Sequence, residues 1–174
     1  MRDLRVLPGF VAGCGQLVEM AAAESQRFVT YPSRAELARR GTGHRAFDPT
    51  RHTEDEEQDQ YHVLPGNRMS QTLRTALLDA LAVPADRQRR FYVQLIRYGT
   101  GDFVLPHRDE VAQGVIPLTT SRRDGLVVEA TEATFVKVPD VAGTLLLCDP
   151  RAWHWVDPVQ DGPRFSLVTI PPPA

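Results

Sequence analysis

The segment "FYVQLIRYGTGDFVLPHRD", residues 91–109, decides the fold, because it joins a strand, a turn and two potential metal ligands. Its first eight residues are rich in the β-branched and aromatic side chains that strands favour. Gly99 and Gly101 then predict a turn, and not a phosphate loop, because no helix and no lysine follow them. His107 and Asp109 stand two positions apart, so in an extended segment both side chains point to one face. The pair indicates a metal site only if a third ligand lies elsewhere.

Downstream of this segment the chain continues as short strands separated by Gly, Pro and Asp. Five further runs have this character: "GVIPLTT", "GLVVEAT", "TFVKV", "GTLLLCD" and "RFSLVTI". They follow one another without a helical period between them. Six such runs within about 80 residues indicate a sandwich, barrel or jelly roll.

The preceding part of the chain, residues 1–88, reads as helix-rich support. The spacing of its apolar residues predicts helices over 12–28, 33–41 and 70–82. Ser33 and Ser70 are typical N-cap residues for the second and third helix, and Pro84 lies beyond the end of the third. Helices followed by strands indicate an α+β fold in which the helices support one sheet.

A polar stretch over residues 42–60 separates the second and third helices and ends in the acidic run "TEDEEQDQ". It is interpreted as a solvated loop, and a lid over an active site is the alternative. The length of 174 residues predicts a single domain over 1–174, with the support and this loop in 1–88 and the strand-rich core in 89–174.

Composition excludes several classes of function. A net charge of −2 provides no electrostatic case for binding nucleic acid or an anionic membrane. No apolar run approaches the length of a membrane span, and polar residues interrupt the N-terminal segment that resembles a signal peptide. Cys14 and Cys148 are too few for a disulfide framework, so a reducing cytoplasm is the expected location. The oligomeric state stays open.

A third ligand is available in "CDPRAWHWVDP", where His154 follows an apolar strand and stands 47 positions after His107. Several strands fit between the two histidines, so the chain can return to the same place. Two histidines and one carboxylate on one face of a metal leave three coordination positions open. That ligand set is the facial triad of non-haem Fe(II) oxygenases.

Ten residues further on, Arg164 and Ser166 share one face of the apolar strand "RFSLVTI". Arginine forms the planar, bidentate clamp for a carboxylate that lysine cannot match. We therefore expect the pair to bind the distal carboxylate of a 2-oxo acid. The alternative is an arginine at a strand end that reaches solvent or an internal aspartate.

With these residues in order, the segment from about 91 to 170 resembles the iron- and 2-oxoglutarate-dependent dioxygenases, and in particular their prolyl-hydroxylase-like branch. "YGTGDFVLPHRD" is similar to that branch's tyrosine, glycine-rich turn and His-x-Asp motif. "AGTLLLCDPRAWHWVDPVQDGPRFS" is similar to its strand, distal histidine and basic residue for 2-oxoglutarate. The stretch "RRDGLVVEA" departs from the usual family pattern, and the N-terminal half matches only loosely.

The resemblance implies a double-stranded β-helix of the jelly-roll, cupin-like type. It makes His107, Asp109 and His154 the catalytic iron ligands, and it makes Arg164 and Ser166 the 2-oxoglutarate contacts. Two tyrosines complete the implied site: Tyr98 lines the pocket, and Tyr92 on the same strand could bond the co-substrate instead. Both tyrosines have the alternative of being core residues.

The implied reaction uses Fe(II), 2-oxoglutarate and O₂, with ascorbate as a candidate reductant, and releases succinate and CO₂. Because the carboxylate ligand is present, hydroxylation of an unactivated C–H bond is favoured over halogenation. The expected substrate is a small amino-acid-like metabolite, because mixed charges are expected near the pocket mouth. The charged residues are Arg97, Asp102, Arg108, Arg122 and Arg123. The alternative is that they are ordinary solvated loop residues with no role in substrate binding. The alternatives are a carrier-bound, peptidyl or protein side chain as substrate, or a cupin-like protein that binds metal or a small acid without turnover.

Overall fold

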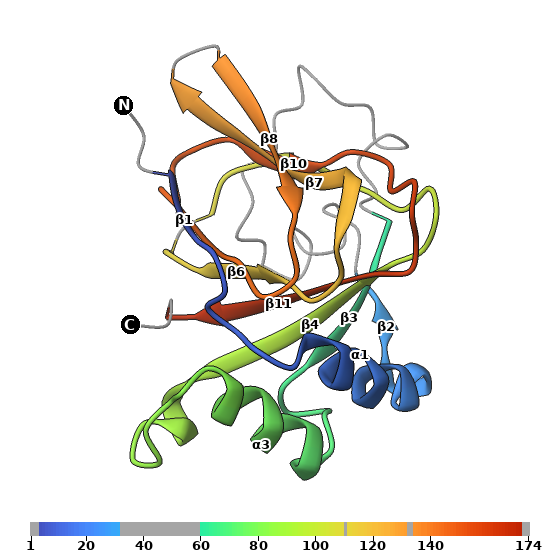
Figure 1. The fold of residues 1–174 in the computed structure, drawn as a ribbon, viewed down its shortest axis with the longest axis vertical. Coiled ribbons are helices and arrows are strands. Elements are labelled where there is room, and N and C mark those ends of the chain that lie inside the picture. The colour runs from blue at the N-terminus through green and yellow to red at the C-terminus, as the bar shows by residue number, and fades with distance from the viewer. Residues whose placement is uncertain (1–3, 32–59, 110, 132–133, 172–174) are drawn as a thin grey trace, which may run out of the picture.

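Two antiparallel β-sheets stack face to face in the part of the chain that the structure describes, residues 4–31, 60–109, 111–131 and 134–171 (Figure 1). In this computed structural model, the larger sheet has the order β1 (Leu4–Leu7), β9 (Leu145–Cys148), β6 (Gly114–Pro117), β11 (Arg164–Ile170), β4 (Tyr92–Tyr98), β3 (His62–Pro65) and β2 (Val29–Thr30). The smaller sheet has the order β5 (Val104–His107), β10 (His154–Val156), β7 (Ser121–Thr131) and β8 (Thr134–Asp140).

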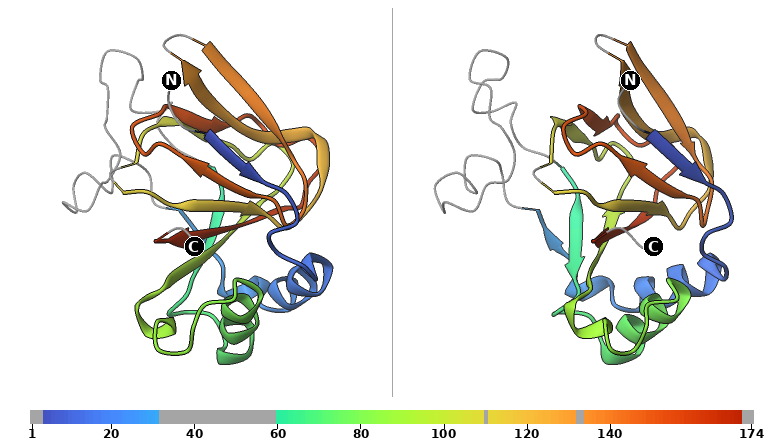
Figure 2. Two further views of the ribbon diagram at one scale, coloured as in Figure 1. Left: turned by 60° about the vertical axis from the view of Figure 1, so that its left-hand side comes forward. Right: turned by 90° about the vertical axis from the view of Figure 1, so that its left-hand side faces the viewer.

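Two α-helices lie side by side on the face of the larger sheet that points away from the smaller one (Figures 1 and 2). They are α1 (Cys14–Ala23) and α3 (Gln71–Ala80), and short 3₁₀ helices η1 (Ser25–Arg27) and η2 (Gln88–Arg90) follow them. The predicted cap of α3 is confirmed, because the Ser70 hydroxyl accepts a hydrogen bond from the Leu73 backbone N–H at 3.1 Å. Within the described residues, no helix is long and apolar enough to cross a membrane.

The larger sheet separates two hydrophobic cores. One lies between the sheet and the helices and contains Leu73 and Leu77 of α3 with Phe165 and Leu167 of β11. The other lies between the two sheets and contains Val168 of β11. Successive residues of a strand point to opposite faces, so β11 supplies side chains to both cores. Its residues 164–169 are all buried.

The fold class read from the sequence is confirmed as an α+β arrangement around a jelly-roll core. All six strand runs predicted after residue 88 correspond to strands, namely β4, β6, β7, β8, β9 and β11. Strands β1, β2, β3, β5 and β10 were not predicted. Three of these lie before residue 88, so this part of the chain contributes to the larger sheet as well as supporting it. The predicted helix over 33–41 and nearly all of the 42–60 loop lie outside the described residues.

Candidate metal and co-substrate site

His107 and His154 lie directly opposite each other on neighbouring strands. His107 ends β5, His154 begins β10, and the two are register partners in the antiparallel pair. Their rings have centroids 4.2 Å apart. Asp109 follows two residues after His107, and its carboxylate lies 3.0 Å from Nε2 of His154 and 3.9 Å from Nε2 of His107. One ligand atom from each residue lies within 4.8 Å of the others, so the structure brings the three predicted ligands together.

Backbone carbonyl groups orient both imidazole rings. Nδ1 of His107 lies 2.8 Å from the carbonyl oxygen of Leu105, and Nδ1 of His154 lies 3.1 Å from that of Ala152. A carbonyl oxygen can only accept a hydrogen bond, so each Nδ1 is the donor in this contact, and Nε2 is the ring nitrogen that faces the cluster and could bind a metal. Both histidines are buried, which keeps these nitrogens away from bulk water.

The carboxylate of Asp109 is held from two sides. The Gln113 side-chain amide donates a hydrogen bond to it. The Asp109 backbone N–H donates to the Pro150 carbonyl oxygen at 2.9 Å, which ties the residue to the turn before β10. Gln113 is a site residue that the sequence did not reveal, because no pattern links it to the His-x-Asp motif four positions earlier.

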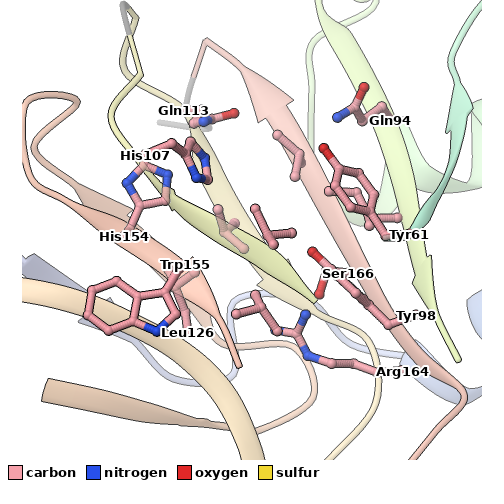
Figure 3. Close-up of a pocket in the computed structure, with 15 residues that line it drawn as sticks. Tyr61, Gln94, Tyr98, His107, Gln113, Leu126, His154, Trp155, Arg164 and Ser166 are labelled. Atoms are coloured by element: carbon pink, nitrogen blue, oxygen red, sulfur yellow. The ribbon is translucent and has the colours of Figure 1, made fainter. Parts of the chain in front are cut away.

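Arg164 and Ser166 lie in the same cavity as the histidines, at its other end (Figure 3). Both residues lie in the first half of β11 and point to the face that meets the smaller sheet. Arg164 is 2% exposed and Ser166 is 1% exposed. The Ser166 hydroxyl is buried without a hydrogen-bond partner among the described residues. A buried hydroxyl of this kind is costly unless a ligand satisfies it. The cavity therefore offers one cation and one unused hydroxyl together.

The Arg164 guanidinium also contacts an internal aspartate. Its Nε lies 2.5 Å from Oδ2 of Asp140, and its Nη2 lies 3.0 Å from Oδ1. Burial alone would lower the pKa of Arg164, but hydrogen bonding and charge from Asp140 and from Tyr98 outweigh burial and raise that pKa. The guanidinium is therefore fully charged. Of the two possibilities that the sequence allowed for Arg164, pairing with an internal aspartate is observed. Arg164 also lines the cavity, and its binding of a carboxylate there stays a prediction.

Of the two predicted tyrosines, the structure brings one to the cavity. Tyr98 is the register partner of Arg164 on β4, it is 3% exposed, and the Arg164 guanidinium carbon lies 4.7 Å from its ring centroid. Tyr92 lies at the other end of β4, is 42% exposed, and donates its hydroxyl hydrogen bond to the Gln94 side chain. A tyrosine that the sequence did not reveal, Tyr61, lines the cavity beside Tyr98 with ring centroids 5.6 Å apart.

The charged residues that were expected at the pocket mouth lie elsewhere in the structure. Asp102 is buried and accepts a hydrogen bond from the Gly99 backbone N–H at 2.7 Å, so it stabilises the glycine turn. Arg97 stacks on Phe28, and Arg108 stacks on Trp153. Arg122 and Arg123 are exposed at the start of β7. None of the five is among the described side chains that line the cavity.

The residues that are present fit a divalent metal and a dicarboxylate. Two imidazole nitrogens and one carboxylate form a donor set that suits Fe(II) and leaves coordination positions free. At the other end, a charged guanidinium and an unsatisfied hydroxyl suit a carboxylate. The apolar side chains between the two ends include Ile96, Val104 and Leu126, which match a short hydrocarbon linker.

Solved structures that are similar to this chain are 2-oxoglutarate Fe(II) oxygenases. The non-haem alpha-ketoglutarate-dependent epimerase SnoN from nogalamycin biosynthesis has TM-score 0.60 and 13% identity, over 97% of this chain and 76% of SnoN. A prolyl-4-hydroxylase from Pseudomonas putida has TM-score 0.53 and 19% identity, over 97% of this chain and 92% of that one. EvdO2 from Micromonospora carbonacea var. aurantiaca, in complex with 2-oxoglutarate, has TM-score 0.51 and 14% identity, over 97% of this chain and 86% of EvdO2.

SnoN is similar also in its complex with Fe³⁺, alpha ketoglutarate and nogalamycin RO, at TM-score 0.57 and 12% identity, over 97% of this chain and 78% of that one. No protein-family model matches this chain, and no curated protein matches it in sequence. At identities this low the likeness is one of fold. The fold implied by the His-x-Asp, His and Arg-x-Ser motifs is therefore confirmed.

Proposed function

We propose that this protein is an Fe(II)- and 2-oxoglutarate-dependent oxygenase that hydroxylates an unactivated C–H bond of a small molecule. The observation that carries the proposal is the shared cavity: His107 and His154, which cluster with Asp109, line one end, and Arg164 with Ser166 lines the other. A protein that only bound a metal would have no use for a buried cation and an unsatisfied hydroxyl in the same cavity as the metal ligands.

In this proposal Nε2 of His107, the carboxylate of Asp109 and Nε2 of His154 hold Fe(II). When bound, Fe(II), 2-oxoglutarate and O₂ together supply the oxidising chemistry that places a hydroxyl group on a C–H bond and releases succinate and CO₂. The Leu105 and Ala152 carbonyl oxygens accept hydrogen bonds from the two histidines, and the Gln113 amide donates one to Asp109. These bonds fix the orientation of the three ligands, so the ligand set is arranged before the metal arrives.

Arg164 and Ser166 bind the distal carboxylate of 2-oxoglutarate, and Tyr98 packs against the guanidinium beside it. The positive charge and the hydroxyl both lie in a water-poor environment, where a charge-assisted hydrogen bond is strongest. The apolar walls of the cavity exclude water from the space between this carboxylate and the cluster. The protein's own part in the reaction is therefore orientation and exclusion of solvent.

For the substrate we propose a small amino-acid-like metabolite. Among the described cavity residues, Gln94 has a side-chain amide that lies away from the two histidines (Figure 3). An amide both donates and accepts hydrogen bonds, so it suits the amino and carboxyl groups of such a molecule. A peptidyl or protein side chain is the second candidate, because a prolyl-4-hydroxylase shares the fold. Both described cysteines are free thiols, which agrees with the proposed cytoplasmic location.

The proposal is tested by substrate-independent turnover of 2-oxoglutarate. Purified protein with Fe(II), ascorbate and 2-oxoglutarate is expected to form succinate under air and not under argon. His107→Ala and Asp109→Ala should lose this turnover and lose Mn(II) binding measured by titration calorimetry. Asp86→Ala, which removes an exposed carboxylate, is the matched control and should keep both.

Two results would contradict the proposal. Absence of succinate together with absence of 2-oxoglutarate binding would favour a metal-binding protein without turnover. Full activity of His107→Ala or Asp109→Ala would show that the ligand assignment is wrong. The substrate is then sought by screening free amino acids and related metabolites for stimulated succinate formation. A negative screen with an active protein would move the assignment to a peptidyl or carrier-bound substrate.

A further inference from the structure

Asp140 occupies part of the hydrogen-bonding capacity of Arg164. Guanidinium has five N–H donors in a fixed plane, and Asp140 accepts from Nε at 2.5 Å and from Nη2 at 3.0 Å. This pair uses one edge of the plane. The two N–H groups of Nη1 and the second N–H of Nη2 belong to other edges. The Tyr98 side chain also accepts a hydrogen bond from the guanidinium. A carboxylate that binds Arg164 from the cavity must therefore use the donors that Asp140 and Tyr98 leave.

The ion pair joins the two sheets. Asp140 is the last residue of β8 in the smaller sheet, and Arg164 is the first residue of β11 in the larger one. Both side chains are almost fully buried, at 0% and 2% exposure. The two parallel hydrogen bonds of a bidentate arginine–carboxylate pair have a narrowly defined geometry. Asp140 therefore fixes both the position and the plane of the guanidinium.

The end of β8 that carries Asp140 is itself held closely. Asp140 is the register partner of Ser121 at the start of β7, and the register then shifts so that Gly125 faces Pro139. A Cβ atom on Gly125 would overlap the Val138 carbonyl oxygen, so the two strands approach more closely here than a side chain permits. A glycine is required for this approach, which keeps the Asp140 carboxylate in place.

Asp140 also changes the electrostatics of the empty cavity. An unpaired guanidinium at 2% exposure would carry a large desolvation cost, and a carboxylate partner offsets it. The cavity end is thus close to neutral before a ligand binds. Its selectivity for a carboxylate then comes from oriented N–H donors and the Ser166 hydroxyl, and less from net positive charge.

We infer that Asp140 is a positioning residue for 2-oxoglutarate, which acts by orienting Arg164 toward Ser166; this inference rests on the proposed function. Asp140 does not touch the co-substrate in this arrangement, because Arg164 stands between Asp140 and the cavity. His107 and His154, which cluster with Asp109, line the other end of the cavity, and the hydrogen bonds that the Asp140 carboxylate accepts come from Arg164 and not from this cluster. A change at Asp140 should therefore affect the affinity for 2-oxoglutarate and not the affinity for the metal.

The test measures binding of 2-oxoglutarate to the Mn(II)-loaded protein by titration calorimetry. Asp140→Asn keeps the shape of the side chain but replaces one acceptor oxygen with a donor, so the bidentate pair is lost. We expect its Kd for 2-oxoglutarate to rise at least about tenfold, with the Kd for Mn(II) unchanged. Asp102→Asn is the matched control: it also alters a buried aspartate, but one whose carboxylate accepts a hydrogen bond from the Gly99 backbone N–H. Its Kd for 2-oxoglutarate should stay within about twofold of wild type.

A double-mutant cycle separates positioning from a general structural role. Lysine has no fork to orient, so Asp140→Asn should raise the Kd far less in an Arg164→Lys background than in the wild type. Asp140→Glu retains the charge and displaces it by one methylene, and it provides a second variant if Asp140→Asn does not fold. We expect Asp140→Glu also to bind 2-oxoglutarate several-fold more weakly, because geometry is disturbed although charge is not.

Unchanged 2-oxoglutarate affinity in both Asp140 variants would overturn the inference. An equal loss of 2-oxoglutarate affinity in Asp140→Asn and Asp102→Asn, or a parallel loss of Mn(II) affinity, would also overturn it, because either would indicate a structural effect. If wild-type protein loaded with Mn(II) does not bind 2-oxoglutarate, the proposed function itself fails, and that result is distinct from binding that is insensitive to Asp140.

Discussion

At the scale of the residue, Ser166 combines a structural cost with a functional use. Its hydroxyl lies 1% exposed on β11, with no hydrogen-bond partner among the residues that the structure describes. Leaving such a group unsatisfied costs about 1–3 kcal/mol, and a bound carboxylate would recover this cost. A residue kept for stability alone would be alanine here. Stability and affinity should therefore respond to its removal with opposite signs.

We predict that Ser166→Ala leaves the free energy of unfolding unchanged or raises it by up to about 1 kcal/mol, while the Kd for 2-oxoglutarate rises about tenfold. Urea unfolding and calorimetry measure the two quantities. Ser121→Ala is the control, because the Ser121 hydroxyl donates to Asp124 and accepts from backbone N–H groups. It should lose stability and keep affinity. A stability loss for Ser166→Ala with unchanged affinity would contradict the role of Ser166.

The pKa of Asp124 provides a pH-dependent prediction. Burial would raise this pKa, but hydrogen bonds from Gln160 N–H, Asp161 N–H and the Ser121 hydroxyl outweigh burial and lower it. A carboxyl group whose pKa is lower in the folded state stabilises the fold above its unfolded pKa of about 3.9, and the contribution is lost as pH falls through the folded pKa.

Asp124→Asn should therefore reduce the free energy of unfolding by about 1–3 kcal/mol at pH 7 and at pH 5. The difference from wild type should shrink as the pH falls below 4. Urea unfolding at several pH values measures both. Asp86→Asn, at an exposed position, should show no difference at any of them. A difference for Asp124→Asn that stays constant down to the lowest pH would contradict the assignment of a charged, hydrogen-bonded carboxylate.

Most of the residues that we propose as ligands could be picked out from the sequence, because they stand in pairs of local spacing. His107 and Asp109 lie on one short segment, and Arg164 and Ser166 lie on another, so spacing alone places each pair on one face. Asp140, Gln113 and Tyr61 could not be predicted in this way. Asp140 reaches Arg164 from the opposite sheet, 24 residues away along the chain. Such a contact depends on how two sheets stack, and no periodic pattern records it.

At the scale of the element, strands were predictable where apolar residues form a long run. Strand β4 has seven residues and β11 has seven, and both were predicted. The missed strands are all short: β10 has three residues, and β3 and β5 have four. Strands β6 and β9 also have four residues, but they were predicted because each lies in a longer apolar run. Pairing with neighbours stabilises the missed strands more than their own composition does, so tertiary context determines them.

Helix α3 supplies a prediction about its first turn. The Ser70 hydroxyl accepts from Leu73 N–H at 3.1 Å and donates to Glu24, and the Glu24 carboxylate also accepts from Ser70 N–H at 3.0 Å. Ser70→Ala should lower the free energy of unfolding by about 1 kcal/mol. Ser70→Asp is the informative comparison. Aspartate is a good N-cap in general, but here its charge would face Glu24.

We therefore expect Ser70→Asp to be no more stable than Ser70→Ala at pH 7 and to regain stability when the carboxylates are protonated. Gln71→Ala, in the exposed first turn of α3, is the control and should change stability little. Thermal unfolding followed by circular dichroism measures all three variants. A stable Ser70→Asp protein at pH 7 would show that Glu24 does not contribute to the cap.

At the scale of the whole molecule, both thiols should be inert in the native, metal-free protein. Burial raises the pKa of Cys14, and burial together with the charge of Asp109 raises the pKa of Cys148 to about 12. Only the thiolate reacts, so at pH 8 the reactive fraction of Cys148 is on the order of 10⁻⁴. Iodoacetamide should label neither cysteine in the native protein, and both in urea, as measured by mass spectrometry. Rapid labelling of one equivalent in the native protein would contradict the burial of these thiols.

Because β11 lies between two cores, its tolerance to mutation should be the lowest in the molecule. Phe165 and Leu167 fill the core beneath the helices, and Arg164, Ser166 and Val168 line the cavity, so no position from 164 to 168 faces solvent. In a library of all single substitutions selected for soluble, co-substrate-binding protein, these positions should retain the fewest variants. Engineering a new co-substrate would therefore begin more safely at cavity positions of the smaller sheet such as Leu126 and Val156, which belong to one core only.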